Sequence, residues 1–338
     1  MGTRRKTVRA PDAFAAYLSL RTVGLFATIW GASILAVDAR AQTYPNRPIR
    51  CIIPYVAGAS PDVVARIIGP RLSERLGQAV VIDNRGGANS IIGTEVAARA
   101  LPDGHTILLG ATALATNPSL YKLSYDAAKS FSPITQTVAV HFLLVVHPSL
   151  SARTVAEFIT LAKARPGQLT FGSAGTGGPG HLAGELLSSL SGIKLVHVSY
   201  KGGPQAQADL IGGQIQAQFD VIATALPHIK AGKTRALGVS SVKRSTILPD
   251  MPTIAETLPG FNMVGWQGFL VPAGTPGEIV QRLHREIVAV FALPDVRQRM
   301  FELGYETVAS SPQEFAQFMR ADTAQFAKII SGAGIRPE

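Results

Sequence analysis

Strand-like and helix-like segments alternate along almost the whole chain from about residue 49 onward. Short apolar runs such as 49–55 (IRCIIPY), 79–83 and 105–109 are typical of buried strands, and helical patterns such as 155–164 lie between such runs. A chain that repeats this order can bury its apolar surfaces by layering helices on a sheet. The alternation therefore predicts an α/β fold with a largely parallel sheet.

Two further apolar stretches predict how the chain divides. The segments 141–147 (HFLLVVH) and 265–271 (GWQGFLV) have the composition of extended strands, and 243–262 is rich in Pro, Thr and Gly, as a long connection would be. We expect both strands to cross between two lobes. The lobes would then divide near residues 145 and 264, and the first lobe would be discontinuous.

The first 41 residues have the order of features that defines a secretory signal peptide. A basic stretch precedes an apolar run over 22–37, which ends before Ala39, Arg40 and Ala41. The run of about 16 residues is shorter than the roughly 20 that a membrane helix needs, although an uncleaved anchor is the alternative. We expect general secretion, cleavage after Ala41 and a periplasmic mature protein.

Charge and cysteine content exclude several classes of function. The net charge is +10, of which the leader contributes +4, and the remaining basic residues form no cluster. Nucleic-acid binding would need a concentrated basic face. Cys51 is the single cysteine, which excludes an internal disulfide and thiolate metal clusters. The sequence accordingly predicts no metal site and no cofactor, and a fold that depends on its packed core.

A glycine-rich segment over 169–182 (LTFGSAGTGGPGHL) is the most chemically suggestive motif. It matches G-x-G-x-x-G between a strand and a helix, but a dinucleotide fold needs an acidic residue after the next strand, where this chain has 199–202 (SYKG). Such a loop can instead direct backbone N–H groups at an anion beside a helix N-terminus, with Ser173 and Thr176 as hydroxyl donors. The alternative is a tight turn without a ligand.

A second loop, 54–62 (PYVAGASPD), also joins an expected strand to a helix. Ser60 is the expected N-cap, and Pro70 predicts a kink or a break in the helix that follows. Asp62 would either contact a polar group of a ligand or only complement the helix dipole. Two such loops, one from each lobe, would face each other across a cleft.

Signatures of hydrolytic enzymes are missing from the sequence. Phe171 occupies the first glycine position of a would-be G-x-S-x-G motif, and the seven histidines form no H-E-x-x-H pattern. His181 follows the glycine loop, where it would be a ligand donor or a solvent-facing residue of the first helical turn. The rival to a binding protein is an exported enzyme that uses the Gly175 loop to bind a phosphate-bearing cofactor.

With these residues in view, the chain from Tyr44 to its C-terminus resembles the substrate-binding proteins of tripartite tricarboxylate transporters, the Bug-type family. The segment 54–62 is similar to the family's P-F-x-x-G-G-x-x-D. Further matching segments are 81–88 (VIDNRGGA), 102–106 (PDGHT), 172–182, 200–202 (YKG), 232–233 (GK), 248–253 (LPDMPT) and Trp266. Their number and order make the resemblance specific, although each alone is weak.

The resemblance implies a two-lobed periplasmic-binding-protein fold of the Venus flytrap, type II-like kind, with two crossover strands. Lobe I would comprise 42–145 and 264–338, and lobe II 146–263. The protein would be a monomer and not an enzyme, and it would capture a small carboxylate for a membrane permease or a sensor. Sequence does not choose among carboxylates. The implied ligand-binding residues are Tyr55, Ala57, Gly58, Ala59, Ser60, Asp62, Ser173, Gly175, Thr176, Gly177, His181, Tyr200 and Asp220.

Two departures from the family pattern concern the ligand more than the fold. Ala59 stands at the second loop glycine, where a positive φ would strain it by about 1 kcal/mol. Gly178 replaces the serine that many members have, which removes a hydroxyl.

Overall fold

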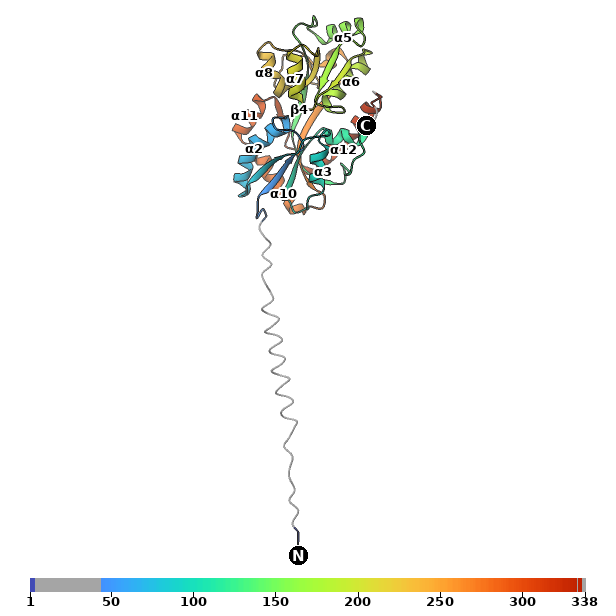
Figure 1. Ribbon diagram of the computed structural model, residues 1–338. Coiled ribbons are helices and arrows are strands. Elements are labelled where there is room, and N and C mark those ends of the chain that lie inside the picture. Colours follow the sequence, from blue (N-terminus) through green and yellow to red (C-terminus); the bar gives the residue numbers. More distant parts are fainter. Residues whose placement is uncertain (4–43, 333, 336–338) are drawn as a thin grey trace. The chain divides into compact units, whose positions relative to one another are not determined.

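The computed structural model describes residues 1–3, 44–332 and 334–335 (Figure 1). The expected signal peptide and its cleavage after Ala41 lie outside these residues. The chain separates into two units, 1–46 and 47–338, and the fold described below is that of the second. Among the described residues, no helix combines the length and apolarity that crossing a membrane requires.

Residues 47–338 form two α/β lobes. The first lobe contains β1 (Ile49–Ile53), β2 (Val80–Asn84), β3 (Thr106–Ala111), β9 (Val264–Pro272), β10 (Tyr305–Thr307), α2 (Ser60–Leu76), α3 (Ile91–Ala98), α4 (Ala113–Thr116), η1 (Asn117–Ser119), α10 (Gly277–Phe291), α11 (Pro294–Glu302) and α12 (Pro312–Gly332). The second contains β5 (Thr170–Ser173), β6 (Val196–Ser199), β7 (Ala217–Val221), β8 (Arg235–Val239), α5 (Val155–Ala164), α6 (Pro179–Ser191), α7 (Gly203–Ile211), α8 (Ile222–Lys230) and α9 (Ile254–Thr257).

One long strand, β4 (Phe131–Val146), belongs to both lobes. Its residues up to His141 pair with β9, and those from Phe142 onward pair with β7 and β8. The chain returns at Met263, whose N–H donates to the carbonyl of Ser240, while the N–H of Ser240 donates to the carbonyl of Phe142. Strand β9 begins at Val264, so both crossings lie side by side. The expected lobe boundaries, near 145 and 264, remain a prediction.

The strand order is β2-β1-β3-β9-β4-β7-β5-β6, with β8 and β10 also paired to β4. Pairing is parallel among β1, β2 and β3 and among β5, β6 and β7, but antiparallel wherever β4 or β9 takes part. The expected α/β architecture is confirmed. The expectation of a largely parallel sheet is wrong for the central strands of the sheet, which pair antiparallel. The reason is that β4 and β9 carry the chain between the lobes in opposite directions.

Helix α2 differs from the sequence-based expectation at two positions. It continues through Pro70 as one element, so the predicted break in the helix is wrong. Pro70 lies on the exposed face of the helix, where water can solvate the backbone carbonyl that loses its hydrogen-bond partner. The N-cap is Ala59 without a side-chain hydrogen bond, and Ser60 is already the first helical residue. The hydroxyl of Ser60 is thereby left to bond elsewhere.

Candidate functional site

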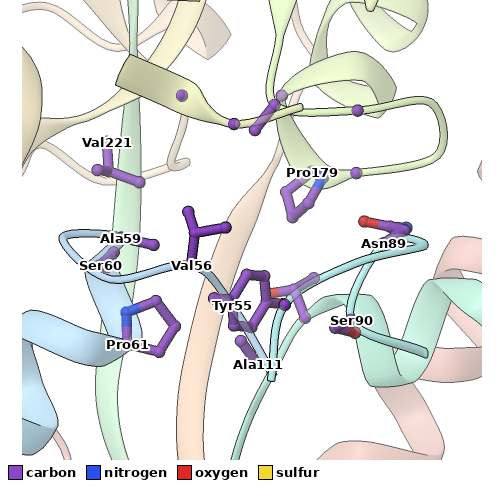
Figure 2. Close-up of a pocket in the computed structure, with 18 of the residues that line it drawn as sticks. Tyr55, Val56, Ala59, Ser60, Pro61, Asn89, Ser90, Ala111, Pro179 and Val221 are labelled. Carbon is purple, nitrogen blue, oxygen red and sulfur yellow. The ribbon is translucent and has the colours of Figure 1, made fainter. Parts of the chain in front are cut away.

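A cavity of about 740 Å³ lies between the two lobes. Its walls are the strand-to-helix loops 54–61, 86–90, 174–180 and 199–204, and the inner ends of β4, β7 and β9 line it further. Figure 2 shows Tyr55, Ala59 and Ser60 on one side of the cavity and Pro179 and Val221 on the other. Most of the wall is apolar or backbone, as is usual for a site that binds a small molecule.

The N-terminal ends of five helices of eight or more residues border this cavity. They are α2, α3, α6, α7 and α8, each reached directly from a loop or strand end that lines the cavity. The first N–H groups of a helix lack partners within it, and the helix dipole places partial positive charge there. Lys201 is the one cationic side chain among the described residues that line the cavity. Positive potential here therefore comes mostly from backbone, which suits a small anion.

The two glycine loops expected from the sequence are built alike. Gly58 (φ 81°) and Gly177 (φ 74°) adopt the left-handed conformation, and each donates its N–H to the side chain four residues later. In the first lobe the acceptor is Asp62 Oδ2 at 2.8 Å, and in the second it is His181 Nδ1 at 3.0 Å. The N-caps between them, Ala59 and Gly178, are extended. Asp62 and His181 thus hold each loop against its helix.

This geometry corrects the expected strain at Ala59. Its φ is −69° and its ψ is 159°, an ordinary extended conformation, because the left-handed position falls on Gly58 instead. Alanine therefore fits this position without strain. The side chain of Ala59 lies at the cavity wall in Figure 2.

Asp62 is buried beneath the first loop rather than at the cavity wall. It is 2% exposed, and its Oδ2 also accepts from Nε of Arg66 at 2.9 Å. Burial opposes ionisation of this carboxyl, but hydrogen bonds from Arg66 and Gly58 outweigh burial and lower its pKa. Asp62 is therefore a charged support of the loop.

Ser60 connects the cavity to the centre of the first lobe. Its Oγ accepts from Nε2 of Gln267 at 2.5 Å and from the hydroxyl of Tyr305 at 2.8 Å. With both donors directed at its oxygen, Ser60 keeps its own hydrogen to donate. Because Ser60 lines the cavity, that hydrogen is suited to a carboxylate oxygen.

Two histidines of the second lobe lie behind the glycine loop. The ring centroids of His181 and His197 are 3.9 Å apart in a stacked arrangement. His197 Nε2 lies 2.7 Å from Oγ of Ser173, which donates to the carbonyl of Gly175 at 3.0 Å. Burial, together with the neighbouring His181, lowers the pKa of His197 to about 3, so its ring is neutral. Ser173 and both rings therefore support the loop from beneath.

The structure brings most of the expected site residues together. Eight of them line the cavity: Tyr55, Gly58, Ala59, Ser60, Gly175, Thr176, Tyr200 and Asp220. The other five do not reach its wall: Ala57, Asp62, Ser173, Gly177 and His181. Four of those five are held in the loop contacts described above. The expectation that Ser173 and His181 face the ligand therefore does not match this geometry.

Loop 86–90 was missed as a site segment by the sequence reasoning. Ala88, Asn89 and Ser90 have φ values of 45°, 48° and 72°, a left-handed run that L-residues rarely adopt. The run is fixed because Asn89 Nδ2 donates to Oδ1 of Asn117 at 2.8 Å, and Nδ2 of Asn117 donates to the carbonyl of Asn89 at 2.9 Å. The signal was available, since Gly86 and Gly87 form a third glycine turn between a strand and a helix.

Other lining residues carry no local signal in the sequence. Val140, Phe142, Gln218, Trp266 and Gln267 are interior positions of β4, β7 and β9. Only the pairing of these strands brings them to one cavity. Among the described residues, no group of three or more His, Cys, Asp or Glu side chains is placed to hold a metal ion.

Comparisons with known proteins agree with this architecture. Residues 64–335 match the model of the tripartite tricarboxylate transporter family receptor. Protein BugT of Bordetella pertussis (strain Tohama I) is 33% identical over 321 residues, which cover 94% of this chain and 98% of BugT.

Two solved structures share the two-lobed fold. The structure of R. palustris Rpa4515 with adipate has a TM-score of 0.83 and 34% identity, and it covers 87% of this chain and 100% of its own. MatC (Rpa3494) from Rhodopseudomonas palustris with bound malate has a TM-score of 0.78 and 29% identity, covering 85% and 100%. The matched family is one of transporter receptors, so the exported enzyme is not supported, and this chain is a receptor rather than an enzyme. The chain belongs to the tripartite tricarboxylate transporter receptor family, the family that its sequence motifs resemble.

Proposed function

We propose that this protein captures a small carboxylate in the cavity between its lobes and delivers it to a tripartite tricarboxylate-type membrane permease. The observation that carries the proposal is the convergence of five helix N-termini on one cavity whose wall contains a single described cation, Lys201. Backbone dipoles of this kind stabilise a carboxylate without a buried arginine. Two related structures, one with adipate and one with malate, support the same class of ligand.

The ligand would contact the residues that line the cavity. Tyr55, Gly58, Ala59 and Ser60 would act from the first lobe, and Gly175, Thr176, Tyr200 and Asp220 from the second. Ala57, Asp62, Ser173, Gly177 and His181 would act through the shape of the loops. Because both lobes contribute, a bound ligand would stabilise their closed arrangement over an open one.

Export is part of the proposal. The leader over 1–41 has the features of a cleaved signal, which would place the mature protein in the periplasm, beginning at Gln42, as a monomer. Amino-terminal sequencing of material from a periplasmic extract tests this directly. Retention of residues 1–41 on that material would contradict it.

A thermal-shift screen of mono- and dicarboxylates, with nucleotides as the comparison set, tests the function. A ligand at 100 times its Kd stabilises the folded state by about 2.7 kcal/mol, which is a readily measured shift. We expect stabilisation by at least one carboxylate and by no nucleotide. Stabilisation by NAD, FAD or ATP but by no carboxylate would overturn the proposal.

A further inference from the structure

Asp220 is an acid in the wall of a cavity that otherwise suits an anion. It is the penultimate residue of β7, is 6% exposed and lines the cavity. Its Oδ1 accepts from the N–H of Val221 at 2.9 Å and from the hydroxyl of Thr224 at 2.6 Å. Its Oδ2 has no hydrogen-bond partner among the residues that the structure describes. A buried acceptor in this state costs free energy until a donor reaches it.

Gln218 adds a second acceptor of the same kind. It precedes Asp220 by two positions on β7, so both side chains point to the same face of the sheet. Gln218 is 1% exposed, lines the cavity and leaves its Oε1 without a partner in the described part of the chain. Gln207, on a helix that packs on β7, is also buried with both amide atoms unpaired there.

The opposite wall continues this pattern. Nε2 of Gln267 is bonded to Ser60, whereas Oε1 of Gln267 is buried without a partner within the described residues. The cavity therefore combines donors at its helix N-termini with unpaired acceptors at its strand ends. A second carboxylate beside Asp220 would meet a like charge and few donors.

We infer that the second lobe selects a carboxylate that also carries a hydrogen-bond donor, an amino or hydroxyl group, which binds Asp220 and Gln218. This inference rests on the proposed function and specifies its ligand. An ammonium group offers three donors and a hydroxyl one, and both suit these acceptors. The carboxylate of the ligand would then complement the charge of Lys201, and its donor group would bind Asp220.

The ionisation of Asp220 separates the two kinds of donor. Burial raises its pKa to about 6, against the hydrogen bonds from Thr224 and Val221. The other ionisable groups that line the cavity are Lys201 and the tyrosines at 55, 121 and 200. Outside its wall, the charge of Asp220 helps to raise the pKa of Tyr305. An ammonium group needs the ionised carboxylate, so its affinity should fall below about pH 6, whereas a hydroxyl can also bond to the protonated acid.

Calorimetric titration with matched acids at pH 7.5 tests the inference. Succinate, malate and aspartate form one series, glutarate, 2-hydroxyglutarate and glutamate a second, and phenylacetate, mandelate and phenylglycine a third. In the series that binds, we expect the amino or hydroxy acid to bind at least about tenfold more tightly than the unsubstituted acid. If the unsubstituted acid binds equally well or better, the inference fails while the proposed function stands. If no carboxylate binds, both fail.

The variant Asp220→Asn assigns the preference to this residue. Asparagine keeps an oxygen for Val221 and Thr224 but loses the charge, so the preference should fall by about tenfold. Asp250→Asn, an exposed acid in the same lobe, is the control and should keep it. An undiminished preference in folded Asp220→Asn protein contradicts the inference.

A measurement on the unmodified protein covers the case in which Asp220→Asn does not fold. If an amino acid binds, its affinity should fall about fourfold between pH 7.5 and pH 5.5, as expected for a group of pKa about 6. If a hydroxy acid binds instead, its affinity should change less than that. An amino acid bound with no such loss would not depend on ionised Asp220, and the inference would be wrong.

Discussion

Asp62 and His181 perform the same task in the two lobes. Each lies in the first turn of a helix and accepts the N–H of a left-handed glycine four residues earlier. One acceptor is a carboxylate beside Arg66 and the other a ring stacked on His197, so the chemistry differs while the geometry agrees. In both lobes, a buried side chain beneath the loop therefore fixes the shape of the loop.

The buried carboxyl of Asp322 should make the free energy of unfolding depend on pH. Its Oδ2 accepts from Nε1 of Trp266 at 2.7 Å, and burial raises its pKa to about 7, although the Trp266 bond acts in the opposite direction. An unfolded aspartate has a pKa of about 3.9, so the folded state binds a proton that the unfolded state releases between these values. The contribution of Asp322 to stability should therefore fall as pH rises from about 4 to about 7.

Asp322→Asn should remove this dependence, because asparagine still accepts the Trp266 N–H without a charge. We expect the variant to be more stable than the parent at pH 8 by about 1–3 kcal/mol and nearly equal at pH 4. Urea unfolding at both pH values measures the difference, with Asp250→Asn as an exposed control. A variant that loses stability equally at both values would show that Asp322 is ionised in the folded protein.

At the scale of elements, the sequence predicted the segments better than their pairing. The helix over 155–164 agrees with α5, and Thr154 caps it by accepting from the N–H of Glu157. Strand β10 and helices α4, α9 and α11 were missed, because segments of three to nine residues show too little periodicity. The antiparallel centre was missed because strand direction depends on contacts between distant segments.

The site was predictable to the extent that it lies in strand-to-helix turns. Gly58 and the glycines at 175, 177 and 178 indicated two of its loops. The third loop, 86–90, carries the same kind of signal in Gly86 and Gly87. Gln218 and Gln267 lie inside strands, and only the register of strand pairing brings their side chains to the cavity. Whether Ser173 would face the ligand or support the loop depended on the direction of one side chain, which sequence does not determine.

Gly93 allows α3 to pack closely against the backbone of the loops that line the cavity. A Cβ at this position would lie 2.5 Å from the carbonyl oxygen of Arg85 and 2.7 Å from Cα of Pro54, both backbone atoms that cannot move aside. Gly93→Ala should therefore destabilise the protein by about 1–3 kcal/mol, despite the better helix propensity of alanine. Gly277→Ala, at the start of α10 with nothing within 4 Å, is the matched control. Equal stability of both variants in denaturant would contradict this packing.

At the scale of the whole folded unit, the lobes meet at a second place besides the crossings of β4 and residue 263. The hydroxyl of Tyr121 donates to the carbonyl of Thr176 at 3.0 Å. Beside it, a Cβ on Gly177 would lie 2.1 Å from Cδ1 of Leu120, so the two loops are in close contact. This contact joins a loop of the first lobe to the glycine loop of the second.

Tyr121→Phe should therefore shift the protein away from the closed arrangement. Loss of one hydrogen bond, about 0.5–1.5 kcal/mol, should lower carboxylate affinity by about two- to tenfold, with little change in stability to urea. Small-angle scattering of the ligand-free variant should show a larger radius of gyration than the parent. An unchanged affinity and an unchanged radius would mean that this contact does not favour closure.

The central claim is that backbone at helix N-termini holds a carboxylate in the cavity, and Ala59 allows a direct measurement. Ala59 is the N-cap of α2, lacks a side-chain cap and lines the cavity. Asparagine or aspartate there should each stabilise the helix by about 1 kcal/mol, but only aspartate adds negative charge to the cavity wall.

Calorimetric titration of Ala59→Asn and Ala59→Asp with the tightest-binding acid of the screen is the measurement. We predict that both variants are at least as stable as the parent, that Ala59→Asn keeps affinity within a few-fold, and that Ala59→Asp binds at least about tenfold more weakly. Equal binding by the two variants would contradict the claim that the carboxylate lies at this helix end.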